Sequence, residues 1–310
     1  MKQQKKWGRL VAGLLAAVQT ALISVTAFAA VGPSVATAQA GDGLELWYNK
    51  PATNYNWVSS SSTNPNDLQP LVVGNGYMGA AFYGALGTEK IQLSEKTLWK
   101  SGPDSRPDYN GGNKTGANVN LPALREAAFA YDQDTVDSIV NTGAFFGNVT
   151  ERGSYQAFGD LNIEFDNPPA ATPSDYKRFL DLENAIGGVE YTQDGVKYTR
   201  EYLANYPENV LAFRLSASEA GKMNLSLGID PLVTEKIGSG KETKVNVEKK
   251  VEHDDTLTVT FNLKSNNMKV ASQMKVLNQG GSLSTTQNNA IRVDGADSVV
   301  VLLTLSLIHI

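Results

Sequence analysis

Cysteine is absent from the 310-residue sequence, and histidine occurs only twice. Without cysteine the chain has neither a disulfide framework nor a thiolate-bound metal site. The two histidines, His253 and His309, lie in a polar loop and within the last two residues. This distribution argues against a histidine-based triad or a zinc site, so we expect no metal and no cofactor.

An excess of positive charge is also missing. The 27 lysines and arginines are outnumbered by 32 acidic residues, which gives a net charge of −5. Such a chain offers no electrostatic reason to bind nucleic acid or an anionic membrane. Its length suffices for one large all-β domain or two ordinary domains, and for a buried core.

The N-terminus has the layout of a secretory signal peptide. A basic segment (Lys2–Arg9) precedes an apolar stretch (10–30), and small-x-small cleavage sites follow at 27–29 and 38–40. A membrane anchor is the alternative, because the apolar stretch is close to spanning length. The small residues and the cleavage sites favour removal of residues 1–40. We therefore expect a bacterial protein that is secreted or at the cell surface, with no membrane association after cleavage.

Glycines crowd the start of the stretch 71–105. Gly74, Gly76 and Gly79 formally match the pattern G-x-G-x-x-G after a strand. A dinucleotide site would need a helix immediately afterwards. Residues 80–84 are instead strand-like and end in a turn, so we interpret the segment as a glycine-rich hairpin.

Most of the remaining chain predicts short antiparallel strands. The clearest signal is Asp194-Gly195, a two-residue type I′ turn between 189–193 and 196–202. We expect further strands at 44–48, 78–83, 90–93, 161–165, 210–215, 223–229, 245–251, 256–263, 268–277, 290–293 and 298–305. Two helices at helical spacing form one insertion at about 121–141. The pattern predicts a mostly β fold, a large antiparallel sandwich over 41–305.

The last residues form an anomalous tail. Residues 299–305 are typical of a core strand, but 306–310 continue apolar and then stop without a turn. We expect a truncated reading frame whose last residues are foreign to the gene.

Several short motifs together resemble the start of glycoside hydrolase family 95, which comprises exported α-L-fucosidases, some acting on α-L-galactosides. The resemblance spans 44–305 in one consistent order. The motifs that carry it are Val73–Ala80, Ile91–Pro103, Tyr155–Leu161, Tyr176–Leu182 and Tyr198–Glu201. Each motif alone is weak, whereas the ordered series is specific.

The resemblance implies an N-terminal β-super-sandwich joined to an (α/α)6 barrel that holds the reaction centre. Hydrolysis in that family is inverting, with a glutamic acid as general acid and an aspartate, helped by asparagines, activating water. Such chemistry needs two carboxyl groups about 6.5–9.5 Å apart. The matching residues would lie beyond Ile310, so no catalytic residue is assigned here. The implied partners are fucosylated glycans, bound by the full-length enzyme, and the chain's own downstream barrel.

Carboxylates near the motifs could in principle act without a barrel: Glu95, Asp104, Asp160, Glu164 and Glu201. Each has a structural alternative. Glu95 could hold a loop through backbone hydrogen bonds, and Asp160 could cap a turn. Glu164 and Glu201 occupy outward positions of alternating strands. A sandwich with an isolated carboxylate lacks an enclosed pocket, so we expect no independent hydrolysis.

Three residues are candidates for substrate binding or for contact with the barrel: Asn75, Glu95 and Trp99. We expect them on the face of the sandwich that meets the barrel, where they would shape the substrate cleft. Trp99 would stack on a sugar or pack at the domain interface. Packing is favoured because large aromatic side chains are mostly buried.

Two classes of function remain open. The first is the non-catalytic N-terminal domain of an exported α-L-fucosidase. The second is a free-standing β-sandwich that binds glycans without chemistry. The first predicts an exposed apolar patch, and the second predicts a polar surface with an aromatic groove.

Overall fold

The computed structural model describes residues 43–52, 70–100, 102, 109–110, 112–141, 145–146, 153–231 and 244–308. The predicted signal peptide and Asp104 lie outside the described residues. Within these ranges no helix is both long and apolar enough to cross a membrane.

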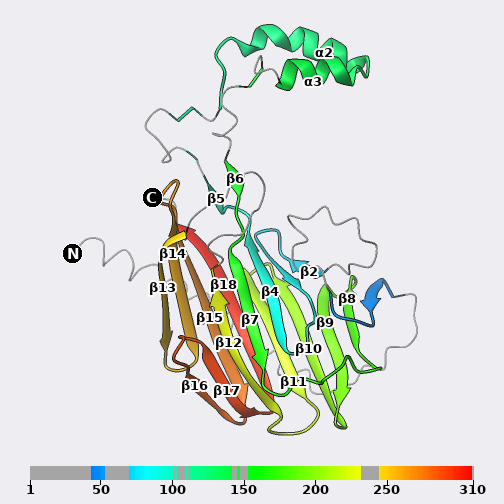
Figure 1. Cartoon of the computed structure of the whole chain (residues 1–310), viewed down its shortest axis with the longest axis vertical. Coiled ribbons are helices and arrows are strands. Elements are labelled where there is room, and N and C mark those ends of the chain that lie inside the picture. The colour runs from blue at the N-terminus through cyan, green and yellow to red at the C-terminus, as the bar shows by residue number, and fades with distance from the viewer. Residues whose placement is uncertain are drawn as a thin grey trace, which may run out of the picture.

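The larger sheet has nine antiparallel strands among the described residues. Its strands are, in spatial order, β1 (Glu45–Tyr48), β8 (Lys177–Asp181), β9 (Ile186–Gln193), β10 (Val196–Asn205), β11 (Val210–Ala217), β18 (Ser298–Ile308), β15 (Lys269–Gln279), β14 (Thr256–Leu263) and β13 (Lys244–Glu252). β18 continues to Ile308, past the predicted end of the last strand. The strands lie side by side in Figure 1.

The second sheet has seven antiparallel strands in the described part of the chain. Their order is β16 (Ser282–Thr285), β17 (Ile291–Ala296), β12 (Met223–Asp230), β7 (Gly159–Phe165), β4 (Thr88–Glu95), β3 (Met78–Phe82) and β2 (Leu71–Gly74). A small ribbon pairs β5 (Trp99–Lys100) with β6 (Ser154–Tyr155). It lies at one end of the sheets in Figure 1.

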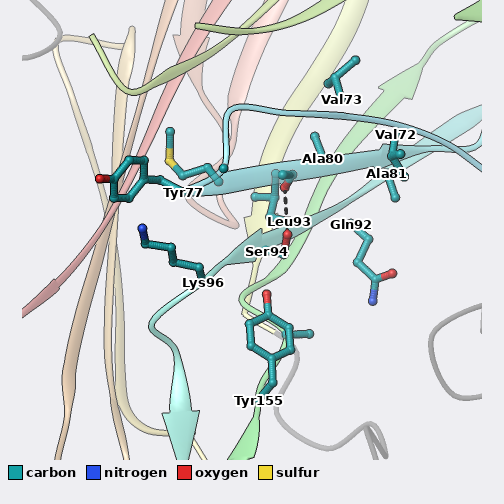
Figure 2. Close-up of a pocket in the computed structure, with 14 residues that line it drawn as sticks. Val72, Val73, Tyr77, Ala80, Ala81, Gln92, Leu93, Ser94, Lys96 and Tyr155 are labelled. Carbon is teal, nitrogen blue, oxygen red and sulfur yellow. Dashed lines mark hydrogen bonds between the residues drawn. The ribbon is translucent and has the colours of Figure 1, made fainter. Parts of the chain in front are cut away.

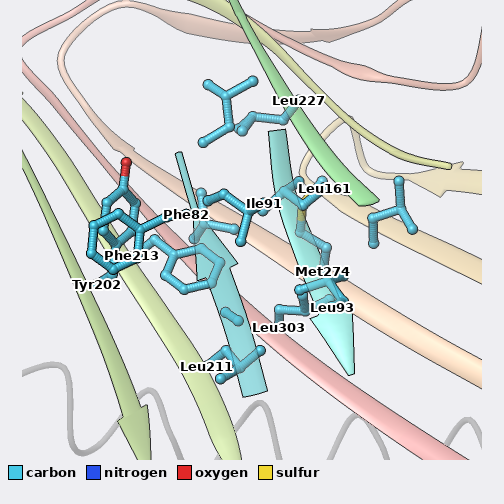
Figure 3. Close-up of a cluster of buried hydrophobic side chains, with 14 of the residues drawn as sticks. Phe82, Ile91, Leu93, Leu161, Tyr202, Leu211, Phe213, Leu227, Met274 and Leu303 are labelled. Carbon is cyan, nitrogen blue, oxygen red and sulfur yellow. The ribbon is translucent and has the colours of Figure 1, made fainter. Parts of the chain in front are cut away.

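The core fills the space between the two sheets. In β4 the side chains alternate, so that Ile91 and Leu93 are fully buried while Gln92 and Ser94 are only half-buried. Figure 3 shows such residues from the seven-stranded sheet meeting their counterparts from the nine-stranded sheet, including Phe82, Leu161, Tyr202, Phe213, Met274 and Leu303. Burial of these faces drives the sheets together. The predicted large antiparallel β-super-sandwich is confirmed.

The predicted hairpin at Asp194-Gly195 is also confirmed. Gln193 pairs with Val196, and the two turn residues have φ angles of 52° and 82°. A type I′ turn requires positive φ at both central positions, which explains the choice of aspartate and glycine.

The helical insertion consists of α2 (Leu121–Phe129) and α3 (Gln133–Asn141), preceded by the short 3-10 helix η2 (Ala117–Asn120). The two helices pack on each other, and Figure 1 shows them standing clear of both sheets. Ala127 is buried, whereas Phe129 and Tyr131 are almost fully exposed. The expected insertion at about 121–141 is therefore present.

The sequence analysis did not list β5, β6, β8 or β16 among the expected strands. β16 contains one apolar residue, Leu283, and is held by its pairing with β17. β5 and β6 span two residues each, too short for any periodicity. Their partners along the chain, rather than their own composition, make them strands.

Candidate functional site

The candidate residues meet at one end of the sandwich. Three turns converge there, 74–77, 95–98 and 205–209, which we call the rim. Lys96 N–H donates to the carbonyl of Tyr77, which ties the first two turns together (2.9 Å). Asn75 and Glu95 lie in these turns, and Trp99 follows directly after the second. The sandwich thus brings all three to the same end of β3 and β4.

Asn75 joins the rim turns to one another. Its side-chain amide donates to the carbonyl of Asn205 (2.8 Å) and to Oδ1 of Asn209 (2.9 Å). Its own Oδ1 accepts from the backbone N–H groups of Tyr77 (2.9 Å) and Met78 (2.8 Å). Two donors and two acceptor positions are the full capacity of an asparagine side chain. Asn75 therefore links the two sheets and has no hydrogen-bonding capacity left for a ligand.

Glu95 holds the second rim turn. Its side chain is buried, and Oε2 accepts from both the backbone N–H and the hydroxyl of Thr97, each at 2.8 Å. The N–H of Leu98 donates to the Glu95 carbonyl at 3.2 Å. These bonds match the structural alternative given for this residue from the sequence.

Trp99 is 45% exposed, so the expected packing does not bury it within the described residues. Its indole N–H donates to the carbonyl of Lys96 at 3.0 Å. Its ring meets Tyr155 edge-on, with centroids 6.1 Å apart. The half-exposed indole of Trp99 is therefore held in place on the surface by its ring contact and by its N–H bond. The reason it stays open is that β5, where it lies, belongs to the small ribbon outside the core.

A groove runs over the outer side of β2, β3 and β4 beside the rim. Its volume is about 590 Å³. Figure 2 shows Tyr77 and Lys96 at one end, Gln92 at the other, and Tyr155 along one wall. The floor is made of small residues, among them Gly79. The sequence analysis missed this groove, although the alternation in β4 already placed Gln92 outside.

Aromatic and polar groups are combined at the groove. The Lys96 ammonium lies 3.3 Å from the centre of the Tyr77 ring, and Tyr206 lies 6.1 Å from that ring between centroids. Tyr77 is 43% exposed and Tyr206 is 65% exposed. Burial raises the pKa of Tyr155, against the opposing hydrogen bonds from Ser94 and Glu95. The Tyr155 hydroxyl consequently stays protonated and able to donate.

The other carboxylates proposed from the sequence occupy separate places. Asp160 is a buried residue inside β7, 3.2 Å from the ammonium of Lys90. Glu164 is exposed on the same strand. Glu201 lies on the other sheet and forms a partly exposed ion pair with Arg214 at 3.6 Å. Asp160 thus lies within β7 and pairs with Lys90 of the neighbouring strand β4.

Among the described residues the most enclosed carboxylate is Glu89, which the sequence analysis did not single out. Its Oε1 accepts from the N–H groups of Tyr83 (2.8 Å) and Gly84 (2.9 Å). Its Oε2 lies 3.4 Å from the guanidinium of Arg200, which also donates to the carbonyl of Ala85 (2.6 Å). Burial raises the pKa of Glu89, and Arg200 opposes that rise. The signal was available, since Glu89 shares the inward register of Ile91.

Lys244 is another buried ionisable residue. Its ammonium donates to the carbonyls of Ala157 (2.9 Å) and Phe158 (2.5 Å). Burial lowers its pKa to about 7, although Asp160 and Asp230 act in the opposite direction. These bonds fix the segment that leads from the groove wall into β7.

Comparison with known families matches residues 46–306 to the description "Glycosyl hydrolase family 65, N-terminal domain". Among curated proteins the chain is similar to alpha-L-fucosidase 2 of Arabidopsis thaliana. The two are 27% identical over 284 residues, which is 85% of this chain and 30% of that protein. It is also similar to a probable alpha-fucosidase A of Aspergillus niger, at 28% identity over 61% of this chain and 22% of that protein.

A third relative, a probable alpha-fucosidase A of Aspergillus oryzae, is 29% identical over 58% of this chain and 24% of that protein. The chain thus corresponds to less than a third of the length of these relatives. A solved structure, a putative kojibiose phosphorylase from human microbiome, shares 12% identity over 85% of this chain and 29% of its own. Its TM-score of 0.43 is too low to establish a shared fold.

Proposed function

The chain belongs to the family described as glycosyl hydrolase family 65, N-terminal domain, and we propose that it is the non-catalytic N-terminal domain of an exported α-L-fucosidase. The parent enzyme is an inverting hydrolase of family 95, secreted or held at the cell surface. Its (α/α)6 catalytic barrel packs on the sandwich, and the rim helps to shape the substrate cleft. Its substrates are fucosylated glycans.

One observation carries this proposal. The match to an α-L-fucosidase takes in 85% of this chain but only 30% of the relative. A sandwich that corresponds to a minor part of a hydrolase is expected to support chemistry performed elsewhere in that hydrolase. The finer assignment to family 95 draws on the ordered motifs of the sequence.

The carboxylates of the described chain support a non-catalytic role. Glu95 is bonded within its own turn, and Glu89 is enclosed with Arg200. Asp160 is paired with Lys90, and Glu201 with Arg214. An inverting site instead needs two carboxyl groups that face one water-filled gap.

Exposed apolar residues support packing against another domain. Leu44, Leu46 and Trp47 on and beside β1 are exposed, as is Leu182, whose N–H donates to the carbonyl of Leu44. Neighbouring apolar side chains at a sheet edge are typical of a surface that contacts another domain.

The test compares this chain with a longer one that includes the downstream reading frame. Both are purified and assayed with an α-L-fucoside. We expect hydrolysis by the longer protein and none by the chain alone. Hydrolysis by the chain alone would overturn the non-catalytic assignment, and inactivity of a folded longer protein would overturn the fucosidase assignment.

A second function, a free-standing glycan-binding module, is favoured by one feature, the groove between exposed aromatic side chains. The same pair of proteins separates the two functions. A free-standing module predicts glycan binding with no hydrolysis in either protein, and a chain that stays monomeric and soluble by itself.

A further inference from the structure

We propose that the helical insertion is a docking element for the domain that follows β18 in the longer protein, with Phe129 and Tyr131 as its anchors. The identity of this partner rests on the proposed function, in which a catalytic domain continues from the chain. The docking surface itself rests on the structure of the insertion. It is a separate surface from the groove and from the exposed apolar residues at β1.

The insertion cannot bury its own apolar residues. Its two helices have nine residues each, and within them only Ala127 is buried. Leu124, Val136 and Ile139 are left half-buried. Helices shorter than about 12–15 residues are marginal in water unless an apolar face packs on another surface. The described sheets do not supply that surface, because the helices stand clear of them in Figure 1.

The turn between the helices carries two aromatic side chains into solvent. Phe129 is 84% exposed and Tyr131 is 95% exposed. The N–H groups of Tyr131 and Asp132 donate to the carbonyls of Ala128 (3.2 Å) and Ala127 (2.9 Å), which is the bonding pattern of a Schellman motif. That motif usually ends in glycine, because its last residue needs a positive φ.

Tyr131 occupies this glycine position with a φ of 59°. A bulky residue in the left-handed region costs free energy. Within the described chain its ring gains no burial that would offset this cost. Backbone strain of this kind is concentrated at functional positions, and tyrosine is frequent among the side chains that anchor an interface. Strain and exposure together therefore indicate that the Tyr131 ring contacts a partner.

The base of the insertion lies beside the end of β18. In the sequence the insertion comes between β5 and β6, which form the small ribbon. The side-chain amide of Asn266 donates to the carbonyl of Trp99 in β5 at 3.0 Å. Three residues later Lys269 pairs with Ile308 of β18. A domain that continues from β18 therefore starts at the end of the sandwich that carries the insertion, as Figure 1 shows.

A tethered partner suits a contact of this size. The matched part of alpha-L-fucosidase 2 is 30% of that protein, so most of such a hydrolase lies outside the matched part. A covalently attached domain meets the turn at a high effective concentration, and two aromatic anchors then suffice to hold it. The downstream domain meets this condition.

A second copy of the chain suits the contact less well. Stable interfaces between separate proteins bury about 1,200 Å² or more, which a hairpin of two short helices is too small to supply by itself. The helices and their turn are also acidic, with Glu126, Asp132, Asp134 and Asp137 against Arg125. Two copies would bring like charges together, whereas an apolar depression with a basic border on the downstream domain would complement the insertion.

The test is hydrogen exchange, followed by mass spectrometry, of the chain and of the longer protein that includes the downstream reading frame. Docking removes the insertion from water and opposes its local unfolding. We expect the amides of 121–141 to exchange at least about tenfold more slowly in the longer protein than in the chain alone. In the chain alone their exchange should be independent of protein concentration.

Two variants and a control test the anchors. Phe129→Ala and Tyr131→Gly in the longer protein should each raise the exchange of 121–141 toward the rate in the chain alone. Glycine suits the φ of 59°, so Tyr131→Gly removes the ring and keeps the turn. In the chain alone Tyr131→Gly should not speed exchange. Val247→Ala removes an exposed apolar side chain from β13 and should leave 121–141 unchanged in both proteins.

The outcomes separate the docking element from the proposed function. Equal exchange in the two proteins, or full protection in both anchor variants, would overturn the docking proposal. Protection that rises with the concentration of the chain alone would also overturn it, in favour of a second copy. In each of these cases the fucosidase assignment stands if the longer protein hydrolyses an α-L-fucoside. Protection of the insertion without hydrolysis would support the docking element and remove the assignment.

Discussion

The two ends of β4 carry two glutamates with opposite settings. Glu89, near the start of the strand, is fully enclosed and paired with Arg200 beneath the 84–87 connection. Glu95, at the other end, closes a turn beside the groove and pairs with Thr97. Both side chains face the core side of the same strand, so the alternation of β4 does not distinguish them. The two glutamates differ in the groups that surround them.

The comparison teaches where to look for function in this domain. At the Glu89 end, the charged side chains of Glu89 and Arg200 point inward and bind each other and nearby backbone groups. At the Glu95 end, internal bonds consume Asn75 and Glu95, but Tyr77, Lys96 and Trp99 remain accessible to a ligand. Conspicuous carboxylates serve the scaffold, whereas the aromatic side chains of Tyr77 and Trp99 next to them are exposed.

The largest expected effect comes from breaking the enclosed pair. Glu89→Ala leaves the Arg200 guanidinium buried without its carboxylate, which should lower the free energy of unfolding by about 3–5 kcal/mol. Glu201→Ala is the matched control, because Glu201 follows Arg200 on β10 but forms a partly exposed pair with Arg214. It should cost about 1 kcal/mol or less. Urea unfolding measures the free energy of unfolding of both variants. Equal losses would contradict the view that the buried pair contributes more to stability than the partly exposed pair.

Lys244 extends the comparison to a buried cation. Its folded-state pKa of about 7 lies below the usual value of 10.5. Above pH 7 the folded chain has released this proton while the unfolded chain still holds it, so stability should rise with pH up to the unfolded pKa. The slope approaches about 1.4 kcal/mol per pH unit.

Lys244→Met should remove this contribution and flatten the profile. Urea unfolding of both proteins between pH 6 and pH 9.5 supplies the difference. Parallel profiles over that window would show that Lys244 keeps its proton in the folded state. Below pH 7 the two profiles should run parallel, since both states then bind the proton.

Removing the rim linker should have a smaller effect. Asn75→Ala deletes four hydrogen bonds that are partly exposed to solvent, so we expect a loss of about 2 kcal/mol in the free energy of unfolding. Asn184→Ala, which loses a solvent-exposed bond to Asp181, is the control and should cost much less. A loss as small as that of the control would mean that the rim turns are held together without Asn75.

The β-sandwich was predictable because apolar residues alternate along its strands. The Asp194-Gly195 turn and β14 (Thr256–Leu263) have strong local signals, and the structure has both as predicted. β16 and the β5–β6 ribbon have almost none, because pairing partners distant in sequence create them. Local pattern therefore specified the layers and missed the weakest edges.

The candidate site was predictable only in its location. The glycine-rich start of the stretch 71–105 correctly marks the rim, but sequence cannot show which polar groups are already satisfied. Asn75 is conspicuous in the sequence because glycines flank it. Its hydrogen-bond partners, however, lie at 205–209, which is distant in the sequence. Tyr77 and Gln92 looked ordinary until the sheets placed them around one groove.

The most direct test of the account is the turnover of the longer protein carrying Glu95→Gln, a carboxylate whose chain neighbours Ser94 and Lys96 line the groove. The account holds that Glu95 only closes a turn, and glutamine can still accept the Thr97 hydrogen bonds through its carbonyl oxygen. It predicts a kcat for α-L-fucoside hydrolysis within about threefold of the unsubstituted protein. Loss of a general acid or base costs about 10²–10⁴-fold. A fall of that size in a folded variant would place catalysis in this domain and contradict the account.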